Sequence, residues 1–328
     1  MPTLTVIGNC QAESLRKLLM STGHFESHRI PPVHELTTAD MPWFGELLKG
    51  SDVVVAQPIR DDYRGLPVGT AQAFATAPPH AQQVVVPVLR FDGLMPYQAI
   101  IRDPDDSSLN PPVVPYHDLR ILVAAAASSG ESVAAGASNV LGRAVTPAAL
   151  RCNVEPAALR CNVEPAALRC NVEALRRNVG PAALRHAAAM SVQQIRNREK
   201  RHDTVVISNF LETNPVWHTV NHPNNETLCV LARGVLRTLG LPTESITAPD
   251  YEMLGELDAP IEPESVDALG VDPTAVAGRE SWKTRNGGVL DEEQIVREQL
   301  EFYRQRPRLV AHGLQRHADR IENLGLLA

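Results

Sequence analysis

A cysteine follows the first strand-like run of the chain, in the segment Gly8-Asn9-Cys10-Gln11. The apolar run Leu4 to Ile7 ends there, and leucines at positions 15, 18 and 19 then mark one buried face of a helix. A helix N-terminus stabilises a thiolate, and its free backbone N–H groups can hold an oxyanion. Cys10 is therefore a candidate nucleophile or a member of an oxyanion pocket. The structural alternative is a small buried side chain in a tight turn.

A second polar cluster, the segment from Gln57 to Arg64, follows the apolar run Asp52 to Ala56. The carboxyl ends of parallel strands share one edge of a sheet, where open α/β folds place their sites. We therefore expect this cluster to lie near Cys10. Arg60 could bind a phosphate group there. The alternative is a solvated set of ion pairs.

Two further clusters contain histidine. Tyr116-His117-Asp118 is the shorter one and carries little weight alone. In the longer one, from Trp217 to Asn225, His222 precedes the predicted N-cap of a helix by two or three residues. A histidine held there is a candidate general base. A surface loop that caps the helix is the alternative.

The elements that would position these residues are those of a parallel α/β fold. Continuous apolar runs at Gln83 to Leu89 and Thr204 to Ser208 join the two runs above, so we expect a parallel sheet of four or five strands. A helical stripe runs from Leu228 to Leu239, with Cys229 packed beside it. Asp291 to Tyr303 and Arg308 to Leu326 predict two C-terminal helices that pack on the main domain.

The middle of the chain carries a repeat. The nonamer from Arg151 to Leu159 recurs without change from Arg160 to Leu168. A proline every nine residues predicts short helices, because proline is tolerated only in a helix's first turn. We interpret the repeat as a tandem duplication in a helical surface segment. Its cysteines, nine residues apart, match no zinc-site spacing, so we expect no metal.

Composition excludes several classes of protein. The 328 residues carry a formal net charge of -7 and no basic cluster, so nucleic acid is not an expected partner. The start of the chain lacks the basic and apolar regions of a signal peptide, and no apolar run is long enough to span a bilayer. We expect a cytoplasmic protein with a small-molecule or saccharide substrate.

Taken in order, the four clusters resemble those of the WcbI-like polysaccharide biosynthesis proteins, acetyltransferases of capsule assembly with a fold related to SGNH hydrolases. The segments that carry the resemblance are Ile7-Gly8-Asn9-Cys10-Gln11, Gln57-Pro58-Ile59-Arg60-Asp61-Asp62-Tyr63, Tyr116-His117-Asp118 and Trp217-His218-Thr219-Val220-Asn221-His222-Pro223. The resemblance implies an SGNH-like parallel sheet flanked by helices, with extra C-terminal helices and a helical repeat insertion. The parts would be an α/β part (1–130), an insertion (131–200) and a segment that completes the site (201–328).

The resemblance also implies transfer of an acetyl group from coenzyme A to a sugar hydroxyl. The catalytic residues would be Cys10 and His222, with His117 as the second choice. The oxyanion or substrate contacts would be Asn9, Gln11, Gln57, Asp61, Tyr63 and Asn221, and coenzyme A would meet Arg60, Arg64 and His218. Two alternatives remain open: an SGNH-like esterase or thioesterase, and a non-catalytic module that binds coenzyme A or another ligand.

Overall fold

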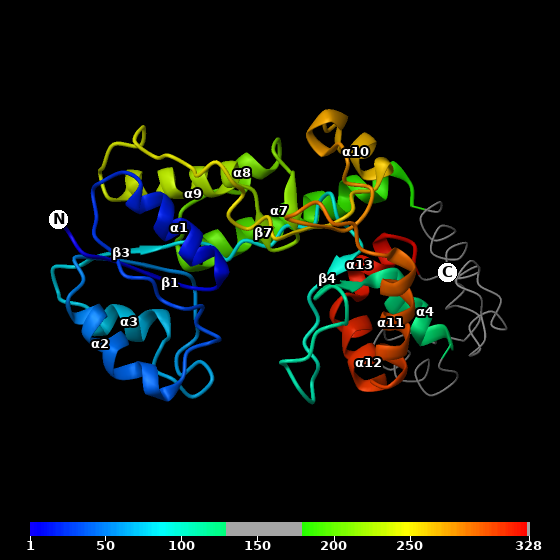
Figure 1. The fold of residues 1–328 in the computed structure, drawn as a ribbon, viewed down its shortest axis with the longest axis horizontal. Helices are drawn as coiled ribbons and strands as arrows, with labels where there is room; N and C mark the ends of the chain where they lie inside the picture. Colours follow the sequence, from blue (N-terminus) through cyan, green and yellow to red (C-terminus); the bar gives the residue numbers. More distant parts are fainter. Residues whose placement is uncertain (129–178, 327–328) are drawn as a thin grey trace. The chain divides into compact units, whose positions relative to one another are not determined.

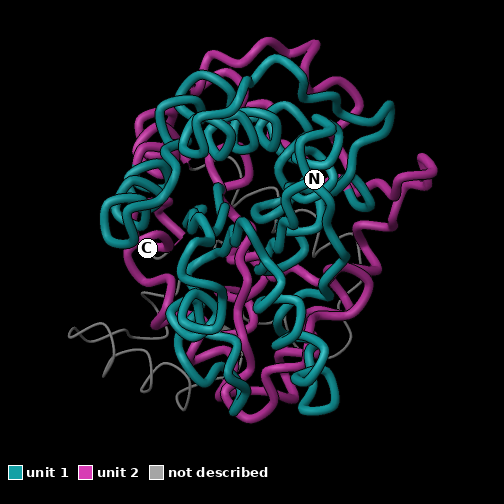
Figure 2. The backbone as a smooth tube through the Cα atoms, turned by 90° about the vertical axis from the view of Figure 1, so that its left-hand side faces the viewer, with its two compact units in different colours: residues 1–91, 190–257 teal, residues 92–189, 258–328 magenta. Residues whose placement is uncertain are grey.

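The computed structural model describes residues 1–128 and 179–326. The two nonamers lie outside these ranges. The chain forms two compact units (Figure 2). Unit 1 comprises residues 1–91 and 190–257, and unit 2 comprises residues 92–189 and 258–328. Each unit is thus built from two separated stretches of chain.

Unit 1 is built on a parallel sheet of three strands, in the order β1 (Leu4–Ile7), β2 (Val53–Ala56), β3 (Gln82–Val85). Every residue of β1 and β2 is buried, which suits continuous apolar runs covered on both faces. The ends of β1 and β2 are in register, with Ile7 opposite Ala56. The segments that follow Ile7 and Ala56 therefore leave the sheet side by side.

The prediction of four or five strands is wrong for the described part of this sheet. The run that begins at Thr204 makes one ladder-like bond, from Val205 N to Val85 O (3.0 Å). The carboxylate of Glu199 then accepts hydrogen bonds from the backbone N–H groups of Ile207 (2.8 Å) and Ser208 (2.9 Å). These bonds turn the chain into helix α8 (Ser208–Leu211) before a strand can extend.

Helices cover both faces of this sheet. Figure 1 shows α1 (Cys10–Met20) and α9 (Asn225–Thr238) on one side, and α2 (Met41–Lys49) and α3 (Thr70–Thr76) on the other. The predicted stripe of α1 is confirmed, since Leu15, Leu18 and Leu19 are buried. The remaining elements of this unit are η1 (Thr38–Asp40), β6 (Trp217–Thr219) and β7 (His222–Pro223). Helix α7 (Pro181–His202) spans the boundary between the two units in the sequence.

Unit 2 has its own core, in which α4 (Leu119–Ser128) packs against α11 (Glu292–Arg304) and α12 (Pro307–Arg316). Helix α11 confirms the first predicted C-terminal helix. The second is wrong in detail, because the chain breaks at His317 into α12 and α13 (Ala318–Asn323). The short elements are β4 (Gln98–Ala99), β5 (His117–Asp118), β8 (Leu257–Asp258), α10 (Pro263–Leu269), η2 (Pro273–Val276) and β9 (Lys283–Thr284).

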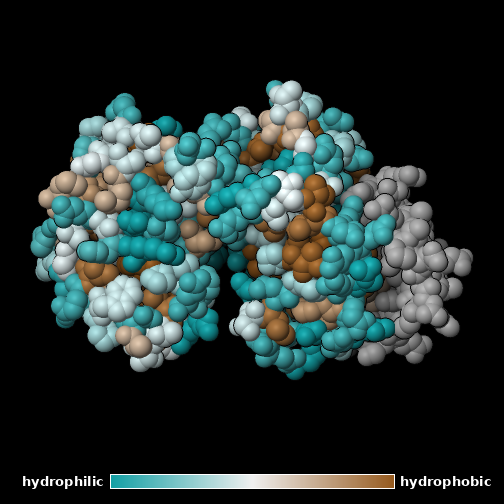
Figure 3. All heavy atoms as spheres, in the orientation of Figure 1, coloured by the Kyte–Doolittle hydropathy of each residue, from teal (hydrophilic) through white to brown (hydrophobic). Residues whose placement is uncertain are grey.

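Figure 3 shows a largely hydrophilic face on each unit, with apolar residues in small groups. In the described part of the chain, no helix has the length and apolar character needed to cross a membrane.

Candidate functional site

The turn between β1 and α1 is shaped by a glycine and a capping asparagine. Asn9 is the N-cap of α1, and its side-chain oxygen accepts a hydrogen bond from Gln11 N (2.9 Å). The N–H of Asn9 donates to Gln57 Oε1 (2.9 Å). A Cβ atom on Gly8 would lie 2.5 Å from that same oxygen. Only glycine therefore lets the Gln57 side chain pass over the turn and hold it.

Two buried glutamines fasten this turn to the segments around it. Gln57 Nε2 donates to Gln11 Oε1 (2.9 Å), which also accepts from Leu89 N (3.1 Å). Gln11 Nε2 donates to the carbonyl oxygens of Leu89 (2.7 Å) and Asn221 (2.8 Å). These bonds use the full hydrogen-bonding capacity of the Gln11 amide. Gln11 therefore positions the site and has no donor left for an oxyanion.

The thiol of Cys10 lies against an imidazole. Cys10 Sγ is 3.5 Å from His222 Nε2, and both residues are half-buried. His222 lies on β7, two residues before Asn224, the N-cap of α9 whose side chain accepts a bond from Thr227 N. The other ring nitrogen of His222, Nδ1, is buried without a hydrogen-bond partner among the described residues. The structure thus brings Cys10, Gln57 and His222 together.

Burial keeps both members of this pair uncharged. Burial raises the pKa of Cys10 to about 11, and the carboxylates of Glu256 and Glu35 add to the rise. The backbone N–H groups at the start of α1 oppose it but are outweighed. Burial also lowers the pKa of His222 below its ordinary value, and nearby His218 lowers it further. At neutral pH the pair is a thiol beside a neutral imidazole, and the expected pre-formed thiolate is not favoured.

An acidic residue that sequence reasoning missed supports the histidine segment. Glu252 Oε2 lies 3.0 Å from His218 Nε2 and accepts a hydrogen bond from Asn225 N (2.7 Å). A Cβ on Gly255 would lie 3.1 Å from the His218 ring, so the chain passes close by. Glu252 lies in a proline- and acid-rich stretch without periodicity, and no sequence signal separates it from its neighbours.

The polar cluster after β2 forms a tight, exposed turn. Arg60, Asp61 and Arg64 are exposed. The Arg60 guanidinium lies 5.9 Å from the centre of the Tyr63 ring, and Arg64 donates to His34 O (2.9 Å). Arg64 adopts a φ of 57°, in the left-handed region. The guanidinium groups thus lie at the surface of unit 1, beyond the buried Gln57.

His117 belongs to unit 2 and is fully engaged there. Its Nε2 lies 3.0 Å from Ile101 O, and its Nδ1 lies 2.8 Å from the Tyr303 hydroxyl. Because a carbonyl oxygen only accepts, Nε2 carries the proton and Nδ1 accepts from Tyr303. Burial lowers the pKa of His117 to about 4. These contacts are those of a core histidine, and none of them involves Cys10.

The sequence of this chain matches one protein family, and its fold is similar to that of a solved structure. The family model described as "Polysaccharide biosynthesis enzyme WcbI" matches residues 3–161 and 163–244. The search of curated proteins finds no match. A solved structure of WcbI is similar over 99% of this chain and 96% of that one, with a TM-score of 0.69 and 17% identity. It is described as the native protein without a disulfide bond between coenzyme A and one of its cysteines. The chain belongs to the family of the polysaccharide biosynthesis enzyme WcbI.

Proposed function

We propose that the chain transfers an acyl group, acetyl in the simplest case, from coenzyme A to a sugar hydroxyl. The observation that carries the proposal is the contact of 3.5 Å between Cys10 Sγ and His222 Nε2 at the start of α1. Membership of the WcbI family supports a role in polysaccharide biosynthesis, and therefore a sugar as the acceptor. The description of the solved WcbI structure mentions coenzyme A, which supports coenzyme A as the ligand.

Because Cys10 and His222 are both uncharged at neutral pH, His222 can act as a general base. A neutral imidazole is a general base, and a base in contact with a thiol can take its proton as the sulfur attacks. With Cys10 as nucleophile, the proton of its thiol moves to His222 Nε2, and the sulfur forms the new bond to the acyl carbon. His222 then returns that proton to the thioester sulfur as the bond between this sulfur and the acyl carbon breaks. In the second half of the reaction, His222 takes the proton of the sugar hydroxyl as its oxygen bonds to the acyl carbon, and gives that proton to Cys10 Sγ as the bond from Cys10 to the acyl carbon breaks. In direct transfer, His222 takes the proton of the sugar hydroxyl as its oxygen bonds to the acyl carbon, and returns that proton to the thioester sulfur as the carbon–sulfur bond breaks. Cys10 then only lines the oxyanion pocket.

Unit 1 carries side chains that could bind the phosphate groups of coenzyme A. The exposed guanidinium groups of Arg60 and Arg64 suit phosphate oxygens. When bound, coenzyme A would supply the acyl thioester. His218 is not part of this proposed coenzyme A contact, because its ring nitrogen Nε2 lies 3.0 Å from Glu252 Oε2. We propose that His218 and Glu252 instead hold the strand pair on which His222 lies.

The test is acyl transfer by the full chain. Acetyl-coenzyme A is incubated with a panel of neutral sugars, free coenzyme A is measured with a thiol reagent, and acetylated sugar is sought by mass spectrometry. Sugar-dependent release is expected. Cys10→Ala should abolish it if Cys10 is the nucleophile, and should leave much of it if Cys10 only lines the oxyanion pocket. Cys229→Ser is the matched control, because Cys229 is a second free cysteine and is buried within α9.

Two results would contradict the proposal. Release at the same rate without sugar, with acetate as product, would identify a thioesterase. Binding of coenzyme A without any release, in the presence of the sugar panel, would identify a binding module.

A further inference from the structure

Unit 2 contains a pocket that takes no part in the thiol–imidazole site. The strand pair β4–β5, the segment before β9 and the start of α11 line it. Strand β4 pairs with β5 in antiparallel register, with Gln98 opposite Asp118. All of the lining residues come from unit 2, so the pocket belongs to that unit alone.

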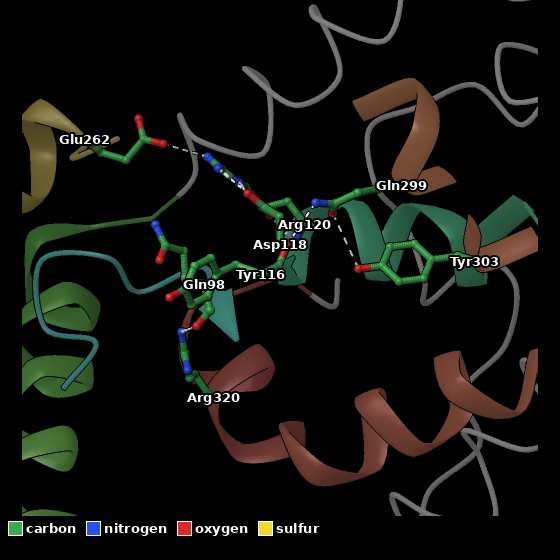
Figure 4. Close-up of polar contacts among 8 residues, drawn as sticks. All are labelled: Gln98, Tyr116, Asp118, Arg120, Glu262, Gln299, Tyr303 and Arg320. Carbon is green, nitrogen blue, oxygen red and sulfur yellow. Dashed lines mark hydrogen bonds and ion pairs between the residues drawn. The ribbon is translucent and has the colours of Figure 1, made fainter. Parts of the chain in front are cut away.

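The side-chain amide of Gln98 lacks a partner in this pocket wall. Gln98 is 6% exposed, and neither Nε2 nor Oε1 has a hydrogen-bond partner among the described residues. Its backbone is fixed, since Gln98 N donates to Met95 O (3.0 Å) and Gln98 O accepts from Arg320. Figure 4 shows the amide directed away from Arg320, and Tyr116 and Glu262 line the same pocket as Gln98. Buried amides almost always have partners, so this one is suited to a ligand that both donates and accepts.

An aromatic pair forms another part of the wall. The rings of Tyr116 and Trp282 are stacked, with centroids 5.7 Å apart and planes 19° from parallel. Gln299 Nε2 donates to Tyr116 O (2.9 Å) and holds that segment from α11. Both aromatic residues line the pocket in a chain in which only 4% of residues are aromatic. Aromatic surfaces offer contact to the C–H faces of a ring-shaped ligand.

The charges of the wall disfavour an anion. Its carboxylates are Asp118, Glu262, Glu280 and Glu292, and its one guanidinium is that of Arg120. Asp118 and Glu262 (2.9 Å) both pair with Arg120, whose guanidinium also covers the Tyr97 ring at 4.2 Å from its centre. The excess of negative charge would repel phosphate groups, while carboxylate oxygens accept hydrogen bonds from hydroxyl groups.

We propose that this pocket binds a neutral pyranose unit of the acceptor saccharide. The amide of Gln98 and the carboxylates meet the hydroxyl groups, and the Tyr116–Trp282 pair meets the apolar face of the ring. This inference rests on the proposed function for the role of the sugar as acceptor. Binding of the sugar itself is independent of catalysis and can be tested alone.

Saturation-transfer NMR on the full chain tests binding, with the methyl α-pyranosides of glucose, mannose and galactose as probes. At least one should receive saturation, and Gln98→Leu should weaken its binding about tenfold, as expected for the loss of one or two hydrogen bonds. Gln305→Leu is the control, because Gln305 is exposed on the same unit and its side chain donates to Glu301 Oε1. The melting temperature of Gln98→Leu should not fall, since the lost amide has no hydrogen-bond partner among the described residues.

Three outcomes would overturn the pocket assignment: no saturation of any of the three pyranosides, equal binding by Gln98→Leu, or Gln98-dependent binding of adenosine 3′,5′-bisphosphate in their place. The two proposals fail in different ways. If sugar binding depends on Gln98 but no acyl transfer occurs, the pocket stands and the proposed function fails. If transfer occurs and Gln98→Leu leaves the acceptor KM unchanged, the function stands and the pocket assignment fails.

Discussion

The sulfur of Cys10 and the Nε2 atom of His222 lie 3.5 Å apart, although 212 positions separate the two residues. Each is placed by the N-terminal region of its own helix, α1 for Cys10 and α9 for His222. Helices α1 and α9 pack against each other on one side of the sheet. The contact therefore depends on helix packing as well as on the two turns.

Replacing His222 should remove the base and leave the fold intact. We expect His222→Gln to lower kcat by about 10²- to 10⁴-fold, the usual contribution of a general base. In the parent protein, kcat/KM should fall as the pH drops through the pKa of His222, which lies below 6.5 because the ring is buried. The measurement is a pH–rate profile of both proteins. An acid limb that persists in the variant would assign the titration to another group.

The thiol of Cys10 should react slowly with alkylating reagents at neutral pH. Burial raises its pKa to about 11 from 9.0, and only the thiolate reacts. At pH 8 the thiolate fraction is thus about a hundredfold smaller than for an unburied cysteine, because each pKa unit is a factor of ten. The rate of iodoacetamide labelling, followed on the Cys10 peptide by mass spectrometry, should keep rising up to pH about 11.

The same peptide from unfolded protein is the control for this labelling experiment, and it should reach its plateau at lower pH. A plateau of the folded protein below pH 9 would mean that the N-terminus of α1 outweighs burial. The thiol would then be a pre-formed thiolate, and His222 would not be needed to activate it.

A methyl group at Gly8 should disrupt the turn that positions Cys10, because it would clash with the Gln57 side chain. Its Cβ would lie 2.5 Å from Gln57 Oε1, so Gly8→Ala must displace the glutamine that holds Asn9 and Gln11. We expect a loss of roughly 1–3 kcal/mol in the free energy of unfolding, as for overpacked cores, together with lower activity.

Gly45→Ala is the matched control for Gly8→Ala. Gly45 lies within α2, and nothing lies within 4 Å of its added Cβ. This substitution should stabilise the protein by up to about 1 kcal/mol, the difference in helix propensity. Urea unfolding of the three proteins measures both effects. Equal stability of Gly8→Ala and the parent would show that the Gln57 side chain can leave the turn without cost.

Local patterns predicted the elements that position Cys10 and His222. The apolar run before Gly8, the stripe of α1 and the capping asparagine of α9 are signals that lie within a few residues of each other. They also sufficed to place Cys10 and His222 at the starts of helices. What they could not supply was the partner of each polar group across the fold, such as Gln57 over Gly8 or Glu252 beside His218.

The predictions that were wrong depended on such distant contacts. Thr204 to Ser208 has the composition of a strand, but the backbone N–H groups of Ile207 and Ser208 donate to the Glu199 carboxylate instead of to a neighbouring strand. The stripe through Val310, Leu314 and Ile321 keeps its helical spacing across the break at His317, so periodicity alone cannot reveal the break. Gln98, within the pocket of unit 2, stands in a segment with no pattern that distinguishes it.

Arg120 should be essential to unit 2 through its ion pairs with Asp118 and Glu262. Its side chain is 6% exposed, while those of the two acids are 20% and 14% exposed. Arg120→Met leaves two largely buried carboxylates without their cation. Removing one member of a buried pair typically costs about 3–5 kcal/mol, much of it the desolvation of the charge left behind.

Lys49→Met is the control for Arg120→Met. Lys49 pairs with Glu46 at 2.8 Å, but both side chains are more than 60% exposed. Solvent screens this pair, so its loss should cost less than about 1 kcal/mol. The free energy of unfolding of each variant, measured by urea titration at pH 7, should therefore separate the two pairs by several-fold. If Arg120→Met proved as stable as Lys49→Met, the pocket wall would tolerate its excess negative charge. The charge argument against an anionic ligand in that pocket would then lose its basis.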